Sequence, residues 1–130
     1  MARLLLDSTV LIDALRGRPA AARVAALRRT GTEPWACAIS VEEIWRGLRP
    51  GERAVASRLV SGLRVAPLGA AEGVRAGTWR RDFAGRGVTL HQADCLIAAA
   101  AFGIGAALAT ANVQDFPMPE VLVDHWPSGG

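Results

Sequence analysis

Short apolar runs alternate with longer segments in which apolar residues recur every three or four positions. The short runs are typical of buried strands, and the longer periodic segments indicate helices that face a core. The expected strands span residues 3–6, 35–39, 64–68, 106–109 and 121–123. The expected helices span residues 9–16, 19–29, 52–63, 70–84 and 91–102, with one more between Ser40 and Gly47.

Strands that alternate with helices predict a parallel sheet covered on both faces. The expected fold is therefore α/β, a three-layer α/β/α sandwich with a central, mostly parallel sheet of four to five strands. The chain contains no linker, repeat or low-complexity run, so residues 1–130 are expected to form one domain.

Local signals predict where several helices begin and which sides they bury. Ser8 is expected to cap the helix that starts at Thr9. Ser40 and Glu43 have the spacing of a capping box at the start of the next helix. The apolar side of the 52–63 helix is expected to comprise Ala54, Val55, Leu59 and Leu63.

The basic residues are all arginine, which excludes two kinds of chemistry. The chain has 15 Lys and Arg residues, none of them Lys, and a net charge of +3. A Walker A loop and a Schiff-base mechanism both require a lysine, so neither is possible here. A small positive charge is compatible with a nucleic-acid partner but is weak support for one.

No apolar run is long enough to cross a bilayer, and Asp7 and Asp13 interrupt the apolar N-terminus, which argues against a signal peptide. We therefore expect a cytoplasmic protein without a membrane partner. The two cysteines, Cys37 and Cys95, are isolated in apolar surroundings and are expected to be buried, reduced thiols.

Four acidic residues occupy comparable places in the predicted architecture. Asp7 ends the first strand, Glu43 lies in the first turn of the helix after the second, and Asp115 follows the fourth. Asp94 lies in the first turn of the most apolar helix. Because the carboxyl ends of parallel strands form one crevice, we expect these side chains to meet there.

Carboxylates gathered in one cleft repel each other unless a cation neutralises them. Mg²⁺ or Mn²⁺ prefers oxygen ligands and can bind a phosphodiester, orient a water and stabilise the leaving oxygen. Each acid also has a structural alternative as a helix-terminal or turn residue, most strongly Glu43. Only the set of four indicates a metal-dependent nuclease.

These residues in this order resemble the PIN-domain family, and in particular its VapC-type toxins. The matching segments are LLLDSTVLIDAL, ISVEEIWRG, HQADCLIAAAA and ATANVQDF, which together span Leu4 to Phe116. The resemblance implies that Asp7, Glu43, Asp94 and Asp115 form a metal-holding quartet. Ser8 would hydrogen-bond a metal-bound water or a carboxylate, and Asn112 would assist Asp115. The family often has a basic residue where this chain has Ala111.

The resemblance further implies a metal-dependent endoribonuclease that hydrolyses RNA, the toxin of a toxin–antitoxin pair. It implies Mg²⁺ or Mn²⁺, with Asp7 and Asp94 as principal ligands, while Glu43 and Asp115 hold a second metal or position the water. It also implies a homodimer and a cognate antitoxin that blocks the cleft. Arg46 is the arginine we single out for RNA contact, whereas the arginines around Trp79 are expected to be solvated, with Trp79 packed inward.

Other interpretations stay open from the residues alone. A phosphotransferase with Asp7 as nucleophile is disfavoured, because Thr9 stands where a second Asp is usual and no lysine is present. A PIN-like module that binds RNA or protein without catalysis is the main alternative. His91 and Cys95 are four residues apart, but no other ligand pair supports a zinc site, so His91 and His125 are expected to be packing residues.

Overall fold

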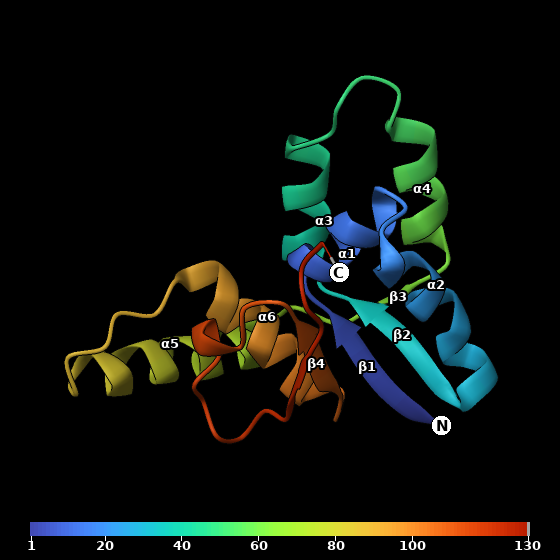
Figure 1. Ribbon diagram of the computed structural model, residues 1–130. Coiled ribbons are helices and arrows are strands. Elements are labelled where there is room, and N and C mark those ends of the chain that lie inside the picture. Colours follow the sequence, from blue (N-terminus) through green and yellow to red (C-terminus); the bar gives the residue numbers. More distant parts are fainter. Residues whose placement is uncertain (130) are drawn as a thin grey trace.

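In a computed structural model that describes residues 1–129, five strands form one parallel sheet (Figure 1). Their order is β3-β2-β1-β4-β5, and every neighbouring pair is parallel. The strands are β1 (Ala2–Leu6), β2 (Thr32–Ala36), β3 (Arg64–Val65), β4 (Ala107–Thr110) and β5 (Val123–His125). The expected parallel sheet is confirmed.

Helices cover both faces of the sheet and complete the expected sandwich. They are α1 (Ser8–Leu15), α2 (Pro19–Ala26), α3 (Ala38–Arg46), α4 (Arg53–Ser61), α5 (Ala70–Ala84) and α6 (Gln92–Gly103), with short 3-10 helices at η1 (Leu27–Thr30) and η2 (Val113–Asp115). Figure 1 shows α5 and α6 together on one side, away from α1, α2 and α4.

Successive residues of β1 point into two different cores, as the pleat of a strand requires. Leu5 packs into the core beneath α5 and α6, whereas Leu4 and Leu6 pack into the core with α1 and α4. A strand buried on both faces explains why the sequence of β1 is a continuous apolar run rather than an alternating one.

The strand order reverses beside β1, which positions the site. The chain passes from β1 to β2 and β3 in one direction, and then returns to place β4 on the other side of β1. In open α/β sheets, ligands bind at the carboxyl edge of the sheet, where the order reverses. Here that point lies between the end of β1, with Asp7, and the end of β4, with Thr110. The backbone N–H of Asp7 donates to the carbonyl of Ala109 at 3.0 Å, so the two strand ends are joined directly.

The predicted position of the second strand was wrong by three residues. The strand spans Thr32–Ala36 rather than 35–39, and α3 begins at Ala38 with Cys37 as its N-cap. Pro34 has no N–H to donate, but the short β3 pairs only beyond it, so the proline is tolerated. The apolar composition of WACAI, residues 35–39, favours a strand, but its last two residues already belong to α3.

This shift makes the predicted capping box wrong. Ser40 lies inside the first turn of α3, fully buried, and Glu43 lies in the second turn rather than the first. Among the described residues, the Ser40 hydroxyl is the one buried side-chain polar atom without a hydrogen-bond partner. Glu43 is therefore not used to cap the helix.

Other local predictions also needed correction. Asp7, not Ser8, caps α1, because its carboxylate accepts from the N–H groups of Thr9 and Val10. Ala56 is the buried residue of α4, whereas Val55 is 39% exposed. Strand β3 has only two residues, and β5 begins two residues later than expected. Turn and cap residues compete for the same short segments, which makes element boundaries the hardest part to predict.

Both cysteines are buried and unpaired, as expected. Within residues 1–129, no helix is long and apolar enough to cross a membrane.

Candidate active site

The four acids come from four different elements and gather at the carboxyl edge of the sheet. Asp7 follows β1, Glu43 lies on α3, Asp94 lies in the first turn of α6, and Asp115 ends η2. Their charges act on one another: the pKa of Asp94 is raised partly by the carboxylates of Asp115, Asp7 and Glu43. The predicted convergence is therefore reflected in the electrostatics of the structure.

Asp7 is held by hydroxyl and amide donors, and within residues 1–129 it forms no ion pair. Its Oδ1 accepts from the N–H of Thr9 at 2.9 Å, from the hydroxyl of Thr9 at 2.5 Å and from the N–H of Val10 at 3.2 Å. Its Oδ2 accepts from the hydroxyl of Thr110 at 2.5 Å. Asp7 is 4% exposed, and burial raises its pKa although these hydrogen bonds act in the opposite direction.

The two threonines link Asp7 to the loop after β4. The Thr9 hydroxyl accepts from the N–H of Ala111 and the Thr110 hydroxyl accepts from the N–H of Asn112, both at 3.0 Å. Because each hydroxyl accepts from a backbone N–H, its own proton is directed at Asp7. The role of Thr9 and Thr110 in orienting Asp7 was not predicted from the sequence. The signal for them was a hydroxyl residue two positions after the first Asp and another at the end of the fourth strand.

Glu43 is positioned by Ser8, which donates its hydroxyl to Oε1 at 2.6 Å across 35 residues of sequence. Ser8 was predicted to hydrogen-bond a carboxylate or a metal-bound water, and the structure shows the bond to a carboxylate. The bond joins the start of α1 to the second turn of α3, so two of the four acidic positions are tied together through α1.

Asp94 and Asp115 are partly buried, and within the described residues neither side chain has a hydrogen-bond donor. Burial raises the pKa of Asp94 to about 6, and the nearby carboxylate of Asp115 adds to this effect, while His91 opposes it. A raised pKa is expected for a carboxyl group that is partly buried and surrounded by three other carboxylates.

The donor set suits a hard divalent cation in its chemistry, because all four groups are carboxylates and their mutual repulsion would be relieved by positive charge. Within residues 1–129, however, no three His, Cys, Asp or Glu side chains stand close enough together to hold a metal as they are placed. Metal binding would therefore draw the side chains inward from their present positions.

Asn112 supports Asp115 through the backbone. Its carbonyl accepts from the N–H of Asp115 at 3.0 Å, which closes the η2 turn. Arg46 lies one turn after Glu43 on α3, with its side chain 71% exposed and its guanidinium 3.9 Å from the carboxylate of Glu42. Its side chain is therefore at the surface.

Trp79 is packed inward as predicted, with 4% exposed, and its indole N–H donates to Glu120 at 2.9 Å. The expectation that His91 and His125 are packing residues was wrong, because both are exposed. His91 is the N-cap residue of α6 and lines a cavity together with Asp94 and Asp115.

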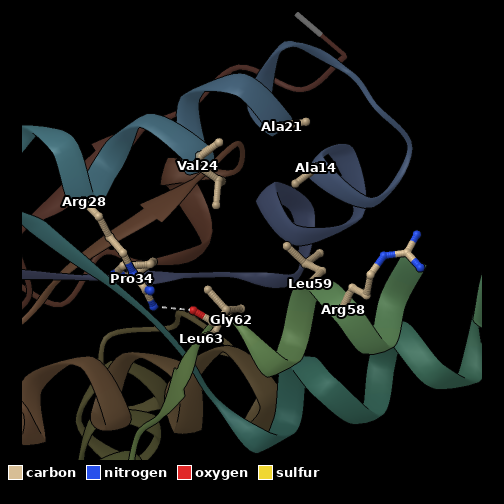
Figure 2. A pocket seen from close by; sticks show the side chains of 10 residues that line it. Ala14, Ala21, Val24, Arg28, Pro34, Arg58, Leu59, Gly62 and Leu63 are labelled. Carbon is tan, nitrogen blue, oxygen red and sulfur yellow. Dashed lines mark hydrogen bonds between the residues drawn. The ribbon is translucent and has the colours of Figure 1, made fainter. Parts of the chain in front are cut away.

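A cavity of about 340 Å³ lies apart from the acids, and none of its lining residues is acidic. Figure 2 shows alanine, valine, leucine and proline side chains around it, with Arg28 of η1 reaching to the carbonyl of Gly62. Apart from Arg28 and Arg58, its lining offers no ionisable group: the other residues are Ala14, Ala21, Val24, Ala25, Pro34, Leu59, Gly62 and Leu63.

Comparison with known proteins gives a consistent result. Residues 4–117 match the family described as PIN domain. The chain is 38% identical over 121 residues to Ribonuclease VapC10 of Mycobacterium tuberculosis, covering 92% of this chain and 90% of that one. It is 35% identical over 119 residues to Ribonuclease VapC19 of the same organism, covering 88% and 92%.

Solved structures share the fold at lower identity. VapBC from Salmonella typhimurium bound to DNA superposes with a TM-score of 0.82 at 22% identity, over 97% of this chain and 99% of that one. VapBC2 from Rickettsia felis bound to a promoter DNA fragment gives 0.81 at 20% identity, over 95% and 98%. These likenesses support the three-layer architecture independently of the closer relatives.

Proposed function

The chain belongs to the PIN-domain family, among its VapC-type members, and from this premise we propose that it is a metal-dependent endoribonuclease, the toxin of a toxin–antitoxin pair. The observation that carries the proposal is the gathering of Asp7, Glu43, Asp94 and Asp115 from four elements at the carboxyl edge of the sheet. Burial, with the other three carboxylates adding to it, raises the pKa of Asp94 to about 6. The ribonuclease activity in the names of the relatives agrees with this site.

The reaction is hydrolysis of an RNA phosphodiester. A water oxygen forms a bond to phosphorus, the bond to one ribose oxygen breaks, and that oxygen takes up a proton. Mg²⁺ or Mn²⁺ held at the acids would neutralise the phosphate and make the attacking water more acidic. Without a cation, four carboxylates would repel the substrate, so activity is expected to require one.

The residues of the chain have distinct tasks in this proposal. Asp7 and Asp94 would hold the cation, with Asp7 kept in one orientation by the hydroxyls of Thr9 and Thr110. Glu43, fixed by Ser8, and Asp115, on the η2 turn, would hold a second cation or position the water. Arg46 would contact a substrate phosphate beside the cleft.

Partners and location follow as part of the same proposal. The solved structures that share this fold include a toxin-antitoxin complex from Klebsiella pneumoniae, with a TM-score of 0.71 at 23% identity. We extend this to a cognate antitoxin that blocks the cleft of this chain, and to a homodimer of the toxin itself. A cytoplasmic location, where RNA is available as substrate, is part of this proposal.

The test is to incubate the purified protein with total RNA, with and without Mg²⁺ or Mn²⁺, and to sequence the product ends. Asp7→Asn is the loss variant. Asp13→Asn is the matched control, because Asp13 is 3% exposed on the same helix but pairs with Arg18 instead of joining the acids. Discrete metal-dependent cuts that vanish in Asp7→Asn and persist in Asp13→Asn support the proposal.

If the protein makes no cuts with either metal, or if Asp7→Asn cuts like the wild type, the active site proposed here is wrong. The alternative is then a PIN-like module that binds RNA or protein without catalysis, since its cellular effect would survive the loss of Asp7.

A further inference from the structure

A cavity of about 210 Å³ adjoins the acids and is not explained by the metal chemistry. Two segments build it, residues 88–91 before α6 and residues 114–117 around the end of η2. Its lining residues are Val88, Thr89, Leu90, His91, Asp94, Gln114, Asp115 and Pro117.

Both segments have buried anchors, so their backbones are well defined. Leu90 is 7% exposed and its carbonyl accepts from Arg80 Nε at 3.3 Å. Phe116 is 4% exposed, and its N–H donates to the carbonyl of Val113 at 3.1 Å. The polar side chains next to these anchors are therefore presented from fixed positions.

Three polar side chains in this lining belong to exposed residues. Within residues 1–129, no side-chain hydrogen bond engages Thr89, His91 or Gln114. By contrast, the hydroxyls that serve the acids, those of Ser8, Thr9 and Thr110, are all engaged. The cavity thus offers an amide, an imidazole and a hydroxyl to a ligand, beside the apolar surfaces of Val88 and Pro117.

We propose that this cavity is a nucleobase subsite that selects the base next to the scissile phosphate, with Gln114 reading its edge and His91 contacting its face. The inference rests on the proposed ribonuclease function. Asp94 and Asp115 belong to both the cavity and the acidic set, so a base held in the cavity lies immediately beside the reacting phosphate.

Size and charge favour a base over the other parts of RNA. The cavity is smaller than the roughly 300–1,000 Å³ of pockets for drug-sized ligands, so it accepts one flat ring system and not a longer fragment. A phosphate in the cavity would face two carboxylates. A neutral base instead presents donors and acceptors, which an amide can pair with, and a π-face, which an imidazole can stack on.

The test measures binding first, so that it does not depend on catalysis. The four single-base RNA tetramers of A, C, G and U, each fluorescently labelled, are titrated in Mg²⁺ against Glu43→Gln, a variant that keeps the proposed principal cation ligands Asp7 and Asp94. We expect affinities that differ by about tenfold between the best and the worst tetramer. Adding Gln114→Ala should remove most of that difference, and adding His91→Ala should weaken all four by about tenfold.

Matched controls are available nearby. Gln92 is an exposed glutamine next to His91 that does not line the cavity, and His125 is an exposed histidine on β5. Gln92→Ala and His125→Ala should leave the four affinities unchanged. If Gln114→Ala keeps the wild-type order and spread of affinities, or if no tetramer binds, the subsite is wrong.

Cleavage of a randomised RNA by the protein with Glu43 intact gives the second readout. The base preference at one position beside the cut should flatten in Gln114→Ala and persist in the control Gln92→Ala. If the protein makes no cuts but Gln114→Ala still removes the binding preference, the ribonuclease proposal fails. The cavity then recognises a base, but not beside a scissile phosphate. If the protein cuts with a base preference that Gln114→Ala leaves unchanged, the ribonuclease proposal is supported and the subsite is wrong.

Discussion

A carboxylate is buried at each end of α1, and the two carboxylates differ in their hydrogen-bond partners and in the direction of their pKa shifts. Asp7 and Asp13 are 4% and 3% exposed, respectively. Asp13 accepts from Arg18 at 2.6 Å and from the N–H of Gly129 at 3.0 Å. Asp7 accepts from hydroxyls and amides only.

The pKa directions follow from these partners. Burial favours the neutral form of both acids, but the hydrogen bonds and charge of Arg18, with the N–H of Gly129, outweigh it and lower the pKa of Asp13. At Asp7 burial outweighs the hydrogen bonds and the pKa is raised. A neutralised carboxylate ties the C-terminal segment to α1, whereas an unneutralised one is left available for a cation. This difference separates a structural acid from a functional one.

Charge removal at the two ends should have the most unequal effect on activity. Asp7→Asn is expected to lower the cleavage rate on the order of 10²–10³-fold or more, as for the loss of a directly acting electrostatic group. Asp13→Asn should leave the rate per folded molecule within about twofold of the wild type, which is a qualitative expectation from its position outside the cluster. Single-turnover cleavage of one RNA under excess enzyme measures both. Equal losses in the two variants would contradict the contrast.

Removing the Thr110 hydroxyl tests whether hydroxyl donors stabilise and orient the Asp7 carboxylate, which has no arginine partner like that of Asp13. Thr110→Val leaves the Asp7 Oδ2 and the N–H of Asn112 without a buried partner, so we expect about 1–3 kcal/mol of lost stability and a rate about 10–100-fold lower. Thr110→Ser keeps the hydroxyl and should restore most of the rate. A purely structural role would lower stability in Thr110→Val without a change in metal affinity, which titration with Mn²⁺ measures.

Removing the Arg18 side chain tests how much its ion pair with Asp13, at the C-terminal end of α1, stabilises the fold. Arg18→Ala leaves a buried carboxylate without its charge partner; because the Arg18 side chain is 41% exposed, we expect a loss of only about 2 kcal/mol. Urea unfolding at pH 7 measures it, with Arg29→Ala as an exposed control. An unchanged midpoint in Arg18→Ala would show that the pair contributes nothing.

The same pair predicts a pH dependence. The folded pKa of Asp13 lies below its ordinary 3.8, so its contribution is fully present above that value and is lost as the pH falls through the folded pKa. Asp13→Asn should therefore lose less stability on acidification than the wild type. Parallel unfolding curves measured from pH 7 down to about pH 2 would reveal the difference, because the loss occurs below the ordinary pKa of 3.8.

The smallest expected effect is a gain. With the pKa of Asp94 raised to about 6, its ionised form is unfavourable in the folded protein without metal. In a chelator at pH 8, Asp94→Asn should raise stability by about 1 kcal/mol after allowance for solvent. The gain should diminish as the pH falls from 6 towards 3.8, where the carboxyl becomes neutral in both states. Asp82→Asn, an exposed change, should show no gain.

Much of the candidate site could be predicted because each acid follows a recognisable element. Asp7 follows a buried apolar run, and Asp94 opens the most apolar helix. The element boundaries could not be read as well. The run WACAI favours a strand by its composition, yet α3 begins within it, so Ser40 is buried inside a helix and Glu43 is free to accept from Ser8.

The sequence by itself determined the alternation of strands and helices, and with it the parallel sheet and the edge at which the acids lie. Periodicity and strand ends are local properties, and the handedness of parallel connections leaves few arrangements. Only the tertiary structure decided which polar groups complete the site, because hydrogen bonds such as Thr110 to Asp7 span 103 residues and depend on strand register. It also decided that Asp7 and Asp13, six residues apart on one helix, differ in charge environment, because Arg18 reaches only one of them.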